Sequence, residues 1–189
     1  MSWIPEFELG IWNAWIFIIL AVLPNILGRF IFKGKNISVK PKTSLPRKYK
    51  KIFNIIMAPI VIGIIYSIFL PLHLNTLWFY IGLLIFLFGF GLQLTVLYTL
   101  QNAKPDRAWT TGPYRYSRQP IYLGMYLMIF SISIMTLSWL FLLLAILLAI
   151  PLLIASSAEE RYCLETYGKE YQEYMRRTPR WIGLPKSKK

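Results

Sequence analysis

The sequence predicts an all-α, polytopic membrane protein with about five transmembrane helices and a C-terminal cytosolic helical segment. Three observations lead to this prediction. Hydrophobic residues make up 56% of the chain and charged residues only 15%, a composition that a water-soluble domain rarely has. Every lysine and arginine falls within residues 29–51, 104–118 or 161–189, and long uncharged apolar runs separate these basic stretches.

The apolar runs set the number of crossings. Residues 11–32, 52–72 and 77–100 each match one crossing, because a helix needs roughly 20 apolar residues to span a bilayer core. Residues 121–155 would form a helix of about 50 Å, which exceeds a core of about 30 Å. We therefore expect a helical hairpin there, with its turn around residues 136–139. Pro24, Pro59 and Pro151 fall inside crossings and are expected to bend them.

The charge distribution predicts the orientation. Five crossings place all basic stretches on one side, which the positive-inside rule assigns to the cytosol, whereas four crossings would divide them between the two sides. The N-terminus, with Glu6 and Glu8, then lies outside and the C-terminus is cytosolic. A net charge of +13 by itself would also suit nucleic acid, but this distribution favours a membrane. No nucleic acid and no metal is expected as a partner.

Two polar segments at the expected cytosolic edge carry most of the chemically informative residues. The first spans residues 112–124 and leads into the hairpin, and the second spans residues 159–181 and follows it. Arginine, glutamate and tyrosine gathered there suit a polar cofactor that bears both carboxylate and ammonium groups. The same residues also suit simple anchoring at the interface, with an amphipathic helix lying on the headgroups. Composition alone leaves both interpretations open.

The order and spacing of these residues resemble the C-terminal half of the isoprenylcysteine carboxyl methyltransferase and phospholipid methyltransferase superfamily. The first block that carries the resemblance is Gly112, Tyr114, Arg118, Pro120 and Tyr122, and the second is Glu159, Glu160, Tyr167, Gly168, Tyr171 and Tyr174. The resemblance implies an integral membrane enzyme that uses S-adenosylmethionine. It implies one membrane domain, in which residues 1–75 carry no family signal and residues 76–189 form the catalytic and cofactor-binding half.

The resemblance also implies roles for individual residues. Arg118 is expected to hold the cofactor carboxylate with help from Gln119 and Tyr122, and Glu159 or Glu160 to bind its ammonium or ribose hydroxyls. Neighbouring residues of a helix point about 100° apart, so only one glutamate is expected to face the cofactor. The expected catalytic residues are Arg118, Glu159 and Glu160. The expected cofactor-binding residues are Tyr116, Arg118, Gln119, Pro120, Tyr122, Gly124, Gly89, Gly91, Glu159 and Glu160, and the expected substrate-binding residues are Gln93, Tyr171, Tyr174 and Arg180.

Gln119 and the glycines Gly89 and Gly91 differ in how they match the family pattern. The family usually has histidine before the proline, where this chain has Gln119. Glutamine forms hydrogen bonds but does not titrate near neutral pH, so it is no general base. Gly89 and Gly91 resemble the Gly-x-Gly that phospholipid methyltransferases place beside the cofactor. Two glycines in a membrane helix also simply allow a neighbouring helix to approach, and Gln93, one turn later, has the same two interpretations.

The expected reaction is methyl transfer to a hydrophobic or lipid-borne acceptor, such as an isoprenylcysteine-like carboxylate, a phospholipid or a thiol, at the cytosolic membrane face. A protonated amine would first have to lose a proton, which weighs slightly against an amine because glutamate is the only obvious base. One alternative is an NADPH-dependent, sterol-type reductase in which Arg176, Arg177 and Arg180 bind the 2′-phosphate. Another is a non-enzymatic membrane protein whose basic loop, residues 33–51, binds anionic lipid.

Overall fold

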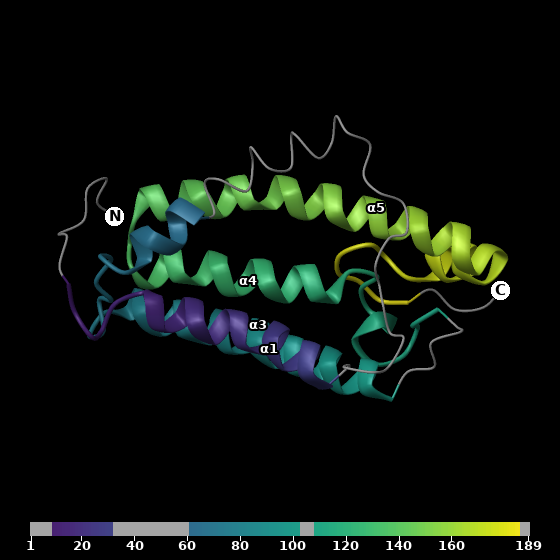
Figure 1. Ribbon diagram of the computed structural model, residues 1–189, viewed down its shortest axis with the longest axis horizontal. Coiled ribbons are helices and arrows are strands. Elements are labelled where there is room, and N and C mark those ends of the chain that lie inside the picture. The colour runs from purple at the N-terminus through teal and green to yellow at the C-terminus, as the bar shows by residue number, and fades with distance from the viewer. Residues whose placement is uncertain (1–8, 32–60, 103–107, 186–189) are drawn as a thin grey trace.

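The computed structural model describes residues 9–31, 61–102 and 108–185, and this part of the chain is helical (Figure 1). The elements are α1 (Trp15–Ile31), α3 (Leu77–Gln101), the short 3-10 helix η1 (Gly112–Arg115), α4 (Pro120–Met135) and α5 (Trp139–Arg177). Residues 61–67 are also helical. The only β-type pairing among the described residues is one isolated bridge between Asn13 and Pro71. The predicted all-α class is confirmed.

The helices that carry the site pack closely along one common direction, with α4 between α3 and α5 (Figure 1). Small residues allow this packing, because a Cβ atom on Gly89 would lie 2.9 Å from the backbone oxygen of Gly124. Gly82 lies seven residues before Gly89, which is about two turns away on the same helix face. A Cβ atom on Gly82 would lie 2.9 Å from the backbone oxygen of Ser131. Glycines at such a crossing allow two helix backbones to touch.

The hairpin predicted for the last apolar run is present. Helix α4 ends at Met135 and α5 begins at Trp139, which confirms the turn expected at residues 136–139. The turn requires a positive φ of 50° at Leu137. Ser138 then caps α5, because its side chain accepts a hydrogen bond from the backbone N–H of Phe141.

Two helices, α3 and α5, are long and apolar enough to cross a membrane. Helices α1 and α4 are shorter and also apolar. Large apolar side chains such as Leu84 and Phe88 point outward from α3, where a soluble protein would place polar ones. This surface indicates a membrane protein.

The structure describes some of the expected membrane crossings in full and others only in part. Helix α3 confirms the helix expected at residues 77–100, and α1 covers most of residues 11–32 with Pro24 inside it. Only residues 61–72 of the second expected crossing are described, and Pro59, the basic loop at 33–51 and both N-terminal glutamates lie outside the described residues. Five crossings and the orientation of the termini remain predictions.

The end of α5 folds back on the molecule. The apolar part of α5 ends at Ala158, and Glu159 begins a charged extension. At Gly168 the backbone leaves the helical conformation, with φ 54° and ψ −122°, and the last helical turns change direction. Residues 178–183 then run beside the segment before α4 (Figure 1), where the Gly183 N–H donates to the Tyr116 carbonyl.

Candidate functional site

Three charged side chains meet where the start of α4, the middle of α5 and the C-terminal segment come together. The Nε atom of Arg118 lies 3.1 Å from Oε1 of Glu160, and the Nε atom of Arg180 lies 3.8 Å from Oε2 of the same carboxylate. The Arg118 and Glu160 side chains are each only 11% exposed. Two guanidinium groups share one carboxylate, so this Arg118–Glu160–Arg180 cluster retains a positive charge that an anionic ligand group can neutralise.

Backbone contacts fix the cluster. The N–H of Arg118 donates to the Pro179 carbonyl at 3.0 Å, and its Nη1 donates to the Met175 carbonyl at 3.2 Å. The hydroxyl of Ser117 donates to the Arg180 carbonyl at 3.2 Å. Each contact joins residues about sixty positions apart, so folding of the C-terminal segment over α4 assembles the cluster.

Two serines of α5 extend the polar surface. Nη2 of Arg180 donates to the Ser156 hydroxyl at 3.0 Å and also to the Ser157 hydroxyl. The buried Gln119 donates through Nε2 to the backbone carbonyl of Ser156 at 3.3 Å. Sequence reasoning missed these serines. The available signal was that Ser156 lies four residues before Glu160 and so shares its helix face.

The two neighbouring glutamates have different partners. Glu160 pairs with the arginines, whereas Glu159 accepts a hydrogen bond from the Tyr122 hydroxyl of α4. Burial raises the pKa of Glu159 from 4.5 to about 7, and the charge of Glu160 adds to this rise while the Tyr122 hydrogen bond opposes it. A carboxyl group with such a pKa exchanges protons near neutral pH.

Several polar atoms of the cluster lack hydrogen bonds of good geometry. These atoms are Nε of Arg118, Nε of Arg180 and Oε1 of Glu160. All three are buried, and none forms such a hydrogen bond with the part of the chain that the structure describes. Their partners among the described residues are one another, across the two ion pairs with Glu160. Buried polar atoms are nearly always hydrogen-bonded, so a ligand that brings both acceptor and donor groups suits this cluster. The α-carboxylate and α-ammonium of an amino-acid-like cofactor have this combination, and the residues present therefore fit S-adenosylmethionine.

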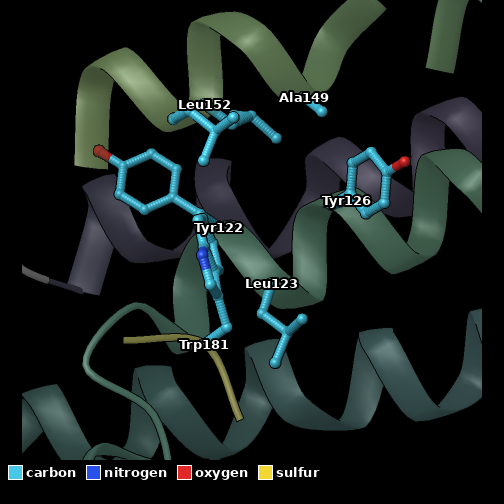
Figure 2. Close-up of a pocket in the computed structure, with 7 residues that line it drawn as sticks. Tyr122, Leu123, Tyr126, Ala149, Leu152 and Trp181 are labelled. Atoms are coloured by element: carbon cyan, nitrogen blue, oxygen red, sulfur yellow. The ribbon is translucent and has the colours of Figure 1, made fainter. Parts of the chain in front are cut away.

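A mainly apolar cavity of about 280 Å³ adjoins the cluster, between α4 and α5 (Figure 2). Trp181, next to Arg180 in the chain, covers part of it, and the Tyr122 ring forms another part of the wall. Two residues of the cavity wall contact the charged side chains: the Trp181 ring lies 5.7 Å from the guanidinium carbon of Arg180, and Tyr122 is hydrogen-bonded to Glu159. Its lining residues are Tyr122, Leu123, Tyr126, Ala149, Leu152, Leu153 and Trp181.

The remaining expected cofactor residues occupy varied positions. Pro120 is buried at the first position of α4, and Gly124 contacts Gly89 at the crossing of α3 and α4. A Cβ atom on Gly91 would meet nothing within 4 Å, and Tyr116 is exposed. The structure thus buries Pro120 at the start of α4, uses Gly89 and Gly124 in packing, and leaves Gly91 and Tyr116 at the surface.

Three of the expected substrate residues lie in the framework around the site. Gln93 donates to the Ile121 carbonyl at 2.7 Å and holds α3 to α4. Tyr174 donates to the Tyr114 carbonyl at 2.6 Å, and Tyr171 packs beside it in a buried cluster. Only Arg180, the fourth, reaches the ionic cluster. Folding back of α5 at Gly168 brings both tyrosines against η1.

The arginines considered for a nucleotide phosphate do not gather. Arg176 is exposed, Arg177 pairs with Glu173, and Arg180 lies in the ionic cluster. The described part of the chain holds no group of three His, Cys, Asp or Glu side chains that could bind a metal ion. The geometry therefore gives the reductase alternative no shared phosphate site.

Residues 77–170 match the family model described as phospholipid methyltransferase. The matched region runs from the start of α3 to just past Gly168, and it includes Arg118, Glu159 and Glu160. The resemblance stated from the sequence motifs is thereby confirmed. Arg180 and Trp181 lie beyond the matched region. A search of curated proteins found no match.

Proposed function

Because residues 77–170 belong to the phospholipid methyltransferase family, we propose that the chain is an integral membrane enzyme that transfers a methyl group from S-adenosylmethionine to a hydrophobic or lipid-borne acceptor. One observation carries the proposal. The ionic cluster, whose buried charges are incompletely hydrogen-bonded, lies beside a mainly apolar cavity. Arg180 belongs to the cluster, and Trp181, the next residue in the chain, lines the cavity. A polar methyl donor and an apolar acceptor would meet at this boundary.

The side chains have distinct roles in this proposal. S-adenosylmethionine supplies a methyl group on a positively charged sulfur. Arg118 and Arg180 bind its carboxylate, and Glu160 binds its ammonium group. Tyr122 and Trp181 shield the boundary between the two halves from water. Alignment of the reactants in a water-poor site supplies most of the rate enhancement, since no covalent catalysis is needed.

The proposed acceptor enters from the lipid. The cavity lies near the lower end of the range for small-molecule pockets, about 300–1,000 Å³, so it accommodates part of one chain rather than a whole lipid. The proposed topology has five crossings with the N-terminus outside. It puts the ionic cluster at the cytosolic membrane face, where the water-soluble cofactor is available.

Calorimetric titration of the detergent-purified protein with S-adenosylhomocysteine tests the proposal, with NADPH as the comparison ligand. Arg118→Ala and Glu160→Gln should each weaken binding about 10- to 100-fold, as expected for loss of a charged hydrogen bond of about 1.5–3 kcal/mol. Arg161→Ala and Glu165→Gln change exposed residues of the same helix and should bind like the unmodified protein.

Folding must be monitored alongside, because removing one partner of a buried ion pair is destabilising. Arg118→Lys keeps the charge but loses the planar guanidinium, and it should weaken binding in a protein that remains folded. Absence of saturable S-adenosylhomocysteine binding by folded protein would contradict the proposal. Binding of NADPH alone would favour the reductase alternative instead.

A further inference from the structure

Trp181 and Ala149 lie at opposite ends of the mainly apolar cavity (Figure 2). Tyr122 and Leu152 line the cavity at the Trp181 end, and Tyr126 lines it at the other end. Tyr126 follows Tyr122 by about one turn of α4, and Ala149 precedes Leu152 by nearly one turn of α5. Both steps lead toward the turn that joins the two helices. The cavity therefore extends from the C-terminal segment into the helical hairpin.

Several contacts hold Trp181 at the polar end of the cavity. The guanidinium carbon of Arg180 lies 5.7 Å from the centre of the Trp181 ring, which is within the range of a cation–π contact. Backbone hydrogen bonds fix the chain on both sides of this residue. The Arg118 N–H donates to the Pro179 carbonyl at 3.0 Å, and the Gly183 N–H donates at 3.1 Å to the segment before α4. The indole is therefore a fixed wall beside the ionic cluster.

Ala149 determines how far the cavity reaches into the hairpin. It has the smallest side chain of the lining residues, because the others are leucine, tyrosine and tryptophan. A benzene molecule occupies an apolar cavity of about 150 Å³, so a phenylalanine at position 149 would take roughly half of the 280 Å³ present. Ile150, the next residue of α5, is 44% exposed and faces outward. A phenylalanine at position 150 should therefore leave the cavity unchanged.

We propose that Trp181 and Ala149 determine the acceptor specificity, by limiting the cavity to a single hydrocarbon chain of about ten carbon atoms. The reacting end of the chain lies at Trp181, next to the ionic cluster, and its tail lies against Ala149. The assignment of this chain to a methyl acceptor rests on the proposed function. Since lipid tails are as apolar as the cavity, the preference for one chain length comes from close packing and exclusion of longer chains.

Photochemical labelling of the cofactor-free, detergent-purified protein tests the assignment. The probe is decanol with a photoactivatable diazirine near its tail, and mass spectrometry identifies the labelled residues. We expect saturable labelling at Tyr126 or Ala149, which an excess of plain decanol prevents. A probe with the diazirine near its hydroxyl group should instead label Tyr122 or Trp181. Outward-facing side chains such as Leu84 contact detergent, so their labelling should not saturate.

Variants test the two ends of the cavity separately, with competitors compared at equal mole fraction in the micelle. Ala149→Phe should make decanol at least fivefold weaker as a competitor and leave hexanol unchanged, whereas Ile150→Phe should alter neither. In the unmodified protein tetradecanol should compete at least fivefold less well than decanol, and Trp181→Ala should remove this difference. Trp78→Ala, at an exposed position of α3, is the control for loss of an indole. Denaturant unfolding monitors folding, and Ala149→Leu is a milder change in the same direction.

Three outcomes would overturn the assignment: no saturable labelling, labelling that does not move with the diazirine, or the same chain-length preference in folded Ala149→Phe and Ile150→Phe. The labelling contains no cofactor, so its result is independent of S-adenosylhomocysteine binding. A protein that binds S-adenosylhomocysteine without saturable labelling would retain the proposed function and lose the chain site. Saturable labelling of a folded protein that binds no S-adenosylhomocysteine would retain the chain site and contradict the proposed function.

Discussion

The side-chain amide of Gln119 donates a hydrogen bond of 3.3 Å to the backbone carbonyl of Ser156, and so ties the residue before α4 to the middle of α5. Gln119 is only 3% exposed. The superfamily usually has histidine at this position, and histidine can also donate a hydrogen bond across such a contact. Glutamine therefore retains the structural part of the role without the titrating ring.

The stability of Gln119 variants should depend on whether the new side chain can donate a hydrogen bond to the Ser156 carbonyl. Gln119→Ala removes the hydrogen bond and leaves space in a buried region, and it should lower the free energy of unfolding by about 1–3 kcal/mol. Gln119→His keeps a donor and should lose less. Denaturant unfolding in detergent, followed by tryptophan fluorescence, measures both. Equal stability of Gln119→Ala and the unmodified protein would show that the contact contributes nothing.

Gly89 and Gly91 form a matched pair for a packing test. A Cβ atom on Gly89 would lie 2.9 Å from the Gly124 backbone oxygen, so Gly89→Ala should separate α3 from α4 and cost about 1–3 kcal/mol. A Cβ atom on Gly91 would have no atom within 4 Å, so Gly91→Ala should leave the free energy of unfolding unchanged or slightly higher. The same unfolding assay compares them, and equal losses would contradict the packing role of Gly89.

The two variants also separate the interpretations of the Gly-x-Gly segment. If Gly91 binds the cofactor, as the family resemblance implies, Gly91→Ala should weaken S-adenosylhomocysteine binding without loss of stability. Unchanged binding would leave the segment with a packing role only.

Some of the arrangement could be predicted from sequence because it depends on local pattern and length. The apolar run at residues 77–100 is long enough for one helix, and the run at 121–155 is too long for one crossing, so α3 and the turn before Trp139 followed directly. Proximity of Arg118 to Glu160 followed from the hairpin, because its two ends must lie side by side.

The rest depends on contacts that sequence separation hides. Pairing of residues 116–118 with residues 179–183 involves backbone groups, and these carry no residue-type signal. The different partners of Glu159 and Glu160 depend on the rotation of α5 relative to α4. The 100° spacing predicted that they diverge, but it did not tell which one meets Arg118. Gly168 appeared only as a motif position, and its bend became visible with its backbone angles.

Gly168 should tolerate few other residues. Its φ of 54° and ψ of −122° match the first central residue of a type II′ turn, which glycine adopts without strain. No atom lies within 4 Å of a Cβ built there, so the cost of Gly168→Ala is conformational, about 1–3 kcal/mol. Gly168→Asn should lose less, since asparagine accepts positive φ more readily than alanine.

The bend at Gly168 also has a functional consequence. It turns Tyr174 toward the Tyr114 carbonyl and precedes the segment that holds Arg180. Gly168→Ala should therefore weaken S-adenosylhomocysteine binding as well as stability. Full affinity together with full stability in Gly168→Ala would show that α5 can continue without the bend.

Glu159 should make stability depend on pH in a defined direction. Its pKa is raised from 4.5 to about 7, so between these values the folded protein binds more protons than the unfolded chain does. Stability should consequently fall as pH rises from about 4.5 to about 7, and this contribution should level off above that range. Glu159→Gln removes the titrating group and should flatten this part of the profile, whereas Glu165→Gln, at an exposed position, should not. Unfolding at a series of pH values in one detergent measures the difference. A profile in Glu159→Gln that falls as steeply as that of the unmodified protein would assign the pH dependence to another group.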